Sequence, residues 1–314
     1  MTPGYTALRE WAALIELPGR GHIRMVGQDR ARLLHAMSTN HIEQLAPGQG
    51  CYAFFLNAQG RILADAHVFR LDECHLLDTE PECRAGLYAH LDHYIIADDV
   101  ELEDRTDDWL ALGVEGPAAA GVLASAGIAS PPEQPFSIHP AGEDLVARVS
   151  ASGGDGFRLF VPVGERRRRM AKLENAGAVA ATPEELRAAR IENGRPRYAE
   201  DITSANLPQE TQLMHALHFS KGCYLGQEIV ERVRSRGHVN RLLVGLTISG
   251  VTAPPSEAPV LAAGQPAGAI TSAAFSPASG RVLALAYLRA EVVAARPPLA
   301  VNGAAAEIHL LKPS

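Results

Sequence analysis

The chain has 314 residues, of which 46% are hydrophobic and 21% are charged, the balance of a globular protein large enough for two domains. Its formal net charge of −7 argues against binding nucleic acid through overall charge. Because no stretch approaches the roughly 18 apolar residues of a membrane span, and the N-terminus lacks the apolar core of a signal peptide, we expect a cytoplasmic protein that does not bind membranes.

The first half of the chain alternates between strand and helix patterns. We expect strands at 22–27, 51–56, 61–69 and 74–78, with a helix after Asp29 and another from Pro81. The pattern then begins again, with strands at 109–114 and 157–163, each followed by a helix. Two successive units of this kind predict a tandem α+β arrangement of ferredoxin-like units.

The remainder of the chain predicts one more helix and then, beyond about residue 236, a region of short strands. Thr182, Pro183 and Glu185 form a capping box that begins a helix, which Gly194 can end. After Arg241, strand-like runs at 242–248, 260–261, 267–270, 282–288 and 308–311 alternate with Gly and Pro turns. This texture predicts a small all-β barrel. We therefore divide the chain into domains at 1–236 and 237–314.

The four cysteines form no Cys-x-x-Cys pair, so neither a zinc ribbon nor a thioredoxin-type motif is present. Cys51, Cys74 and Cys83 are most simply small buried hydrophobes. His90 and His93 have a spacing that can bind metal on a helix, but no third ligand accompanies them. No metal site is predicted.

The segment Lys221–Glu228 is the densest group of chemically active side chains in the sequence. Gly222 permits a tight turn, and the helix pattern that follows places Cys223 at or just before a helix N-terminus, beside Lys221. Both features favour the thiolate over the thiol. Cys223 and Lys221 are therefore candidate catalytic residues, although residue type alone favours a buried cysteine in a tight turn.

This segment also carries a family resemblance. Its sequence, Lys-Gly-Cys-Tyr-x-Gly-Gln-Glu, resembles the signature of YgfZ-type folate-binding proteins at every specified position, and these proteins are relatives of the glycine cleavage T-protein. Residues 189–194, Tyr198 and the hairpin at 57–69 are similar to the same superfamily. The resemblance implies a central opening that holds tetrahydrofolate, or a one-carbon derivative of it, in the tandem ferredoxin-like units, followed by the small barrel.

The resemblance also implies the residues that bind the folate. Glu192 matches the T-protein glutamate that pairs with the pterin, whose N3–H and 2-amino group can both donate to one carboxylate. Tyr198 and Asp65 complete the expected cofactor-binding set. T-proteins carry two adjacent aspartates in the hairpin, whereas Ala64 replaces one of them here. This departure argues against aminomethyl transfer.

The function implied is tetrahydrofolate-dependent support of iron–sulfur enzymes, including those that modify tRNA. The expected partners are client enzymes or cluster-assembly proteins, and we expect a monomeric accessory factor rather than a true aminomethyltransferase. Two alternatives stay open. One is a T-protein-like aminomethyltransferase acting on a lipoyl-carrying partner, and the other is an interaction scaffold that has lost folate. Retention of Glu192 argues against the scaffold.

Overall fold

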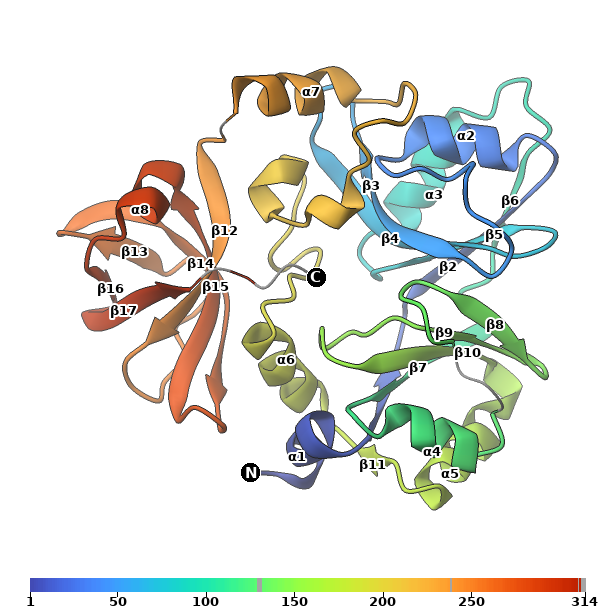
Figure 1. The fold of residues 1–314 in the computed structure, drawn as a ribbon, viewed down its shortest axis with the longest axis horizontal. Helices are drawn as coiled ribbons and strands as arrows, with labels where there is room; N and C mark the ends of the chain where they lie inside the picture. Colours follow the sequence, from blue (N-terminus) through green and yellow to red (C-terminus); the bar gives the residue numbers. More distant parts are fainter. Residues whose placement is uncertain (129–131, 238, 310, 312–314) are drawn as a thin grey trace.

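The structure is a computed structural model that describes residues 1–128, 132–237, 239–309 and 311. Its strands form two open sheets and one closed barrel. In Figure 1 the barrel, coloured orange to red, stands to one side of the two sheet-containing units, and the yellow segment after residue 192 runs between them. Within these residues, no helix combines the length and the apolar character needed to cross a bilayer.

The first unit is a five-stranded sheet covered by two helices. Its elements are β2 (Gly21–Val26), α2 (Arg30–Met37), β3 (Gly50–Leu56), β4 (Ile62–Arg70), β5 (His75–Thr79), α3 (Arg84–His93) and β6 (Glu101–Asp104). The strand order is β3-β4-β5-β2-β6, and every neighbouring pair is antiparallel. Leu34, Phe55 and Leu91 belong to one buried cluster, which places both helices on the same face of the sheet.

The second unit repeats this order of elements. It consists of β7 (Trp109–Glu115), α4 (Ala119–Ser125), β8 (Ile138–Ala141), β9 (Asp144–Ala147), β10 (Gly156–Pro162), the 3-10 helix η1 (Val163–Glu165), α5 (Arg166–Asn175) and β11 (Val179–Ala180). Its sheet order is β11-β1-β7-β10-β9-β8. The extra strand, β1 (Ala13–Leu17), lies antiparallel to β7 and parallel to β11. Apart from β1, the two sheets have matching strand orders.

The segment between the second unit and the barrel begins with α6 (Pro183–Glu192), whose predicted capping box is present. The Glu185 amide donates to Thr182 Oγ1 at 3.2 Å, and the Thr182 amide donates to the Glu185 carboxylate at 2.7 Å. The segment continues with η2 (Pro208–Thr211), η3 (Met214–Ala216) and α7 (Gln227–Arg236). The N-terminal helix α1 (Pro3–Glu10) packs on α6.

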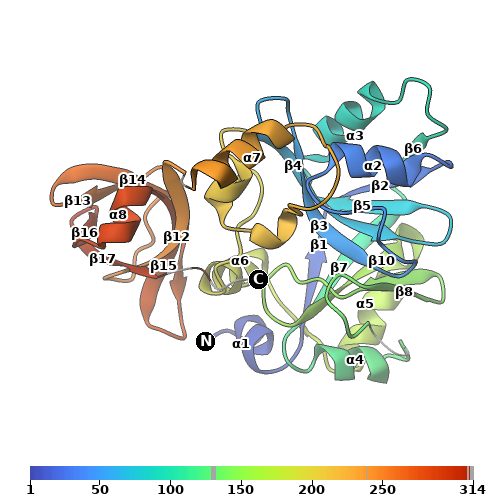
Figure 2. The ribbon, with the colours of Figure 1, turned by 45° about the horizontal axis from the view of Figure 1, so that its top comes forward.

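The barrel closes in the strand order β12-β15-β14-β13-β16-β17. Its elements are β12 (Arg241–Ile248), β13 (Pro259–Ala262), β14 (Gln265–Ser276), β15 (Arg281–Arg289), α8 (Ala290–Ala295), β16 (Leu299–Val301) and β17 (Ala304–His309). Small aliphatic side chains such as Val244, Leu246 and Ile270 fill it. The predicted α+β architecture with a C-terminal barrel is confirmed, and Figure 2 shows α6 beside the barrel and α7 leading towards it.

Candidate functional site

A cavity of about 380 Å³ lies where the two sheets meet α6. Residues of β1, β4, β5, β10, α6 and the loop after α6 line it. Its volume falls in the range of about 300–1,000 Å³ that is usual for small-molecule sites. The lining is highly charged and contains six arginines, namely Arg20, Arg158, Arg187, Arg190, Arg195 and Arg197.

A buried carboxylate, Asp78 on β5, binds two of these arginines. Arg20 Nε lies 2.6 Å from Asp78 Oδ1, and Arg158 forms an ion pair with Oδ2. Burial alone would raise the pKa of Asp78, but Arg158 and Arg20 together lower this pKa well below its usual value. Beside it, burial lowers the pKa of His67 to about 3, so this ring is neutral. Asp78 therefore offsets one of the two buried guanidinium charges, and Glu80, which also contacts Arg20, offsets the other.

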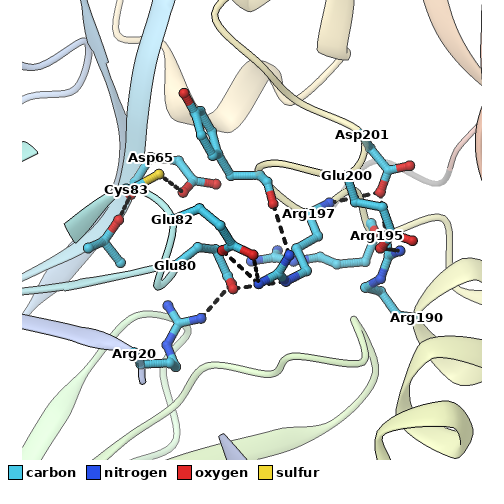
Figure 3. A network of polar contacts seen from close by, with 12 residues as sticks. Arg20, Asp65, Glu80, Glu82, Cys83, Arg190, Arg195, Arg197, Glu200 and Asp201 are labelled. Carbon is cyan, nitrogen blue, oxygen red and sulfur yellow. Dashed lines mark hydrogen bonds and ion pairs between the residues drawn. The ribbon is translucent and has the colours of Figure 1, made fainter. Parts of the chain in front are cut away.

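The ion pairs continue along the side of the cavity. Arg20 also contacts Glu80, and Glu80 Oε2 lies 3.0 Å from Arg197 Nε. Arg197 Nη2 in turn lies 2.8 Å from a carboxylate oxygen of Glu82. Figure 3 shows this chain of alternating charges running between the sheet and the loop after α6. Such pairing holds the loop that carries Arg197 against the first unit.

Asp65 on β4 is a second buried carboxylate of the cavity, and it has no arginine partner among the described residues. Its Oδ2 accepts a hydrogen bond from the Tyr52 hydroxyl at 2.5 Å. Burial, together with the negative charge of Glu80, raises the pKa of Asp65 to about 6. A carboxyl group with this pKa can take up and release a proton near neutral pH, as general acid–base catalysis requires.

Ala64, where T-proteins have the other aspartate, points away from the cavity. Successive residues of a strand face opposite sides of the sheet. Ala64 is fully buried in the apolar cluster under α2 and α3, while Asp65 lines the cavity. A carboxylate in place of Ala64 would therefore enter the hydrophobic core. The replacement removes no charge from the cavity, so the argument drawn from it against aminomethyl transfer does not hold.

Glu192, the expected pterin ligand, is not among the residues that line the cavity. One of its oxygens accepts from the Tyr5 hydroxyl at 2.5 Å, and the other contacts Arg9 Nη1 at 2.7 Å. Both donors belong to α1, so Glu192 fastens α1 to α6. Its pterin-binding role stays a prediction, and it would require the carboxylate to release both donors.

Tyr198 also lies outside the lining, where its hydroxyl donates to the Leu63 carbonyl at 2.7 Å. This bond ties the loop after α6 to β4, the strand that carries Asp65. Tyr198 therefore helps to hold β4 in position without contacting the cavity itself. Of the three expected cofactor-binding residues, Asp65 is the one that faces the cavity.

Neither Lys221 nor Cys223 lines the cavity. The Lys221 ammonium is buried, where it donates to the carbonyls of His35 and Ser38, the latter at 2.6 Å. Its burial lowers the pKa of Lys221 to about 7. The expected position of Cys223 at a helix N-terminus is wrong, because α7 begins at Gln227. Gly226 has a φ of +82°, which a right-handed helix cannot include, and the helix starts only after it.

The cysteines differ sharply in exposure, which gives a testable prediction. Cys223 is exposed, whereas Cys51, Cys74 and Cys83 are buried. A thiol must be reached by solvent to be alkylated, so iodoacetamide should modify one thiol per native chain. Mass spectrometry should place that label on Cys223. In Cys223→Ser the native chain should take up none, and after unfolding it should take up three; labelling of a buried cysteine before Cys223 would contradict the structure.

Sequence reasoning missed the arginines, Tyr52 and Asp78. Each of these side chains is ordinary in its local sequence, and only the meeting of β3, β5, β10 and the loop after α6 brings them together. Within the described residues, no group of three or more His, Cys, Asp or Glu side chains is arranged to hold a metal ion.

Two family comparisons cover most of the chain. Residues 3–221 match the GCVT N-terminal domain, and residues 241–312 match the glycine cleavage T-protein C-terminal barrel domain. The chain belongs to the glycine cleavage T-protein (GCVT) family. Family membership confirms the T-protein part of the resemblance, while the YgfZ-type assignment stays a prediction. Cys223 and α7 lie between the two matched ranges.

Individual relatives agree with this assignment. The aminomethyltransferase of Streptomyces coelicolor is 32% identical over 302 residues, covering 90% of this chain and 80% of the relative. The aminomethyltransferase of Rubrobacter xylanophilus is 30% identical over 303 residues, covering 91% and 78%. The crystal structure of glycine cleavage system aminomethyltransferase T from Bartonella henselae covers 98% of this chain and 88% of its own, with a TM-score of 0.90 and 22% identity. This GCVT-family chain therefore has the same fold.

Proposed function

We propose that the GCVT-family chain binds tetrahydrofolate, or a one-carbon derivative of it, in the central cavity. The cavity combines an apolar wall, formed by side chains such as Ile15, Leu17 and Leu186, with the buried polar pair Tyr52 and Asp65. An aromatic ring system with polar edges needs both kinds of surface. The names of the relatives, which are aminomethyltransferases, support a folate-dependent function of this class.

The reaction that the site supports best is transfer of an aminomethyl carbon from a lipoyl-carrying partner to the folate. The observation that carries this proposal is the orientation of β4, which keeps Asp65 in the cavity and turns Ala64 into the core. In this transfer the carbon leaves sulfur and nitrogen and forms bonds to two folate nitrogens. The two hydrogens displaced from those nitrogens end on the released ammonia and on the freed thiol. Asp65 is placed to carry a proton between these groups.

A two-stage experiment tests the proposal. Calorimetric titration with tetrahydrofolate should first show binding at one site per chain. The protein, supplied with tetrahydrofolate and an aminomethyl-lipoyl carrier, should then release ammonia in a folate-dependent way, at a rate of order 1 s⁻¹ as is ordinary for enzymes. Folate binding without any ammonia release would reject the transfer reaction, and absence of folate binding would reject the whole proposal.

The second candidate is support of iron–sulfur enzymes, and the exposure of Cys223 favours it. The thiol lies outside the cavity, in a segment between the two matched domains. A role in transfer chemistry would place it against the folate instead. In a deletion strain with impaired iron–sulfur enzymes, Cys223→Ser should fail to restore their activity while its folate titration equals that of the wild type. Full rescue would remove this candidate.

A further inference from the structure

Arg195 differs from every other arginine of the cavity because no carboxylate in the described part of the chain pairs with it. The remaining five each form at least one ion pair, with partners Asp78, Glu80, Glu82, Glu200 and Asp201. Arg195 lies immediately after Gly194, which ends α6 with a φ of +68°. The turn directs the side chain into the cavity, where it is only partly buried.

Two uncharged rings hold the Arg195 guanidinium in place. Its central carbon lies 5.5 Å from the centre of the Tyr52 ring, and Nη2 lies 3.4 Å from His67 Nε2. A guanidinium presents five N–H donors in a rigid plane, and these contacts occupy few of them. The planar fork that remains matches the two oxygens of a carboxylate. Arg195 is thus a positioned cation with unused donors.

The ion pairs of the cavity agree with this. Carboxylates that line the cavity, or that lie just outside the lining as Glu82 and Asp201 do, offset the charges of the other five arginines. Within the described residues, Arg195 is thus the arginine of the lining that has no ion-pair partner. A cation held in a partly buried cleft attracts ligands of the opposite charge.

We infer that Arg195 binds a carboxylate of the molecule that occupies the cavity. The inference rests on the proposed function and assigns Arg195 to the glutamate part of the folate, because the pterin ring alone offers no anion to this guanidinium. The carboxylate can also belong to a separate small acid that binds beside the ring. These two sources share one chemistry and are separated by the choice of ligand.

The test compares wild type, Arg195→Gln and the control Arg168→Gln by calorimetry. Arg168 is exposed on α5, so Arg168→Gln removes a positive charge without changing a residue of the cavity. The ligands are tetrahydrofolate, 6-methyltetrahydropterin, which has the ring alone, and 4-aminobenzoylglutamate, which has the carboxylates alone. Arg195→Gln should weaken the binding of tetrahydrofolate about 10- to 100-fold, the usual effect of losing a charged hydrogen bond. Its affinity for the bare ring should stay within about twofold.

Each outcome separates the inference from the proposed function. Unchanged tetrahydrofolate binding in Arg195→Gln, or an equal loss for the bare ring, would overturn the role of Arg195. A second outcome would also overturn the inference: the wild type binds the bare ring and tetrahydrofolate with equal affinity, and it does not bind 4-aminobenzoylglutamate. In that case the proposal of folate-type binding still stands. If the wild type binds neither folate nor ring, the proposed function fails; Arg195-dependent binding of 4-aminobenzoylglutamate would then preserve the inference, and its absence would reject it.

Discussion

Asp78→Asn should lower the free energy of unfolding by about 3–5 kcal/mol, the usual result of removing one partner from a buried ion pair. Asparagine keeps the shape of the side chain but leaves Arg20 and Arg158 without the carboxylate that they share. Denaturant unfolding at pH 7 measures the loss. The matched control is Glu228→Gln, which breaks the exposed pair with Arg232 and should cost about 0.5 kcal/mol at most.

The pH dependence of this difference has a definite sign. The pKa of Asp78 is lowered in the folded state, so its contribution is fully present above the ordinary value of 3.8 and is lost as the pH falls through the folded-state pKa. The free energies of unfolding of wild type and Asp78→Asn should therefore differ by a constant amount above about pH 5 and converge in acid. A loss below 1 kcal/mol at pH 7 would mean that the cluster relaxes or admits water.

Asp65→Asn should slow the proposed carbon transfer by about 10²- to 10⁴-fold, the usual contribution of a general acid–base group. Tetrahydrofolate affinity should change little, because asparagine keeps an acceptor for the Tyr52 hydroxyl. Single-turnover measurement of ammonia release separates the chemical step from binding. A rate equal to that of the wild type would remove Asp65 from the mechanism.

The same variant gives a stability signal that is independent of activity. Burial raises the folded-state pKa of Asp65 from 3.8 to about 6. Its stabilising contribution is therefore present below pH 3.8 and is lost as the pH rises through about 6. Asparagine cannot ionise. Between pH 4 and pH 8, the free energy of unfolding of Asp65→Asn should therefore rise by on the order of 2 kcal/mol relative to that of the wild type. A difference that does not vary with pH would contradict this environment for Asp65.

The parts of the fold that sequence predicted are those determined by short patterns. The capping box at Thr182 and Glu185, the hairpin that joins β3 to β4, and the barrel strands between Gly and Pro turns each depend on neighbouring residues. The second sheet was only partly predicted, because β1 pairs with residues far along the chain. Ala13 is opposite both Glu115 and Val179. No local pattern specifies such a pairing.

The candidate site follows the same division. Asp65 could be found, because the hairpin that carries it resembles the hairpin of the T-protein superfamily. The partners of Glu192 could not be found, since Tyr5 and Arg9 belong to α1, which is far from Glu192 along the sequence. For Cys223, the helix pattern was correct in kind, but the position of Gly226 in a left-handed turn displaced the helix start.

The placement of β1 has a consequence for how the chain folds during synthesis. Ala13–Leu17 leaves the ribosome before the first unit does, yet its two neighbours, β7 and β11, emerge only after the whole first unit has been made. Contacts of such high sequence separation form slowly, since a long loop must close before they are gained. The first unit can condense on its own, whereas the second must wait for a strand that has stayed unpaired. A rearranged chain that begins at residue 18 and carries residues 1–17 between β11 and α6 would shorten that wait and should refold faster than the natural order.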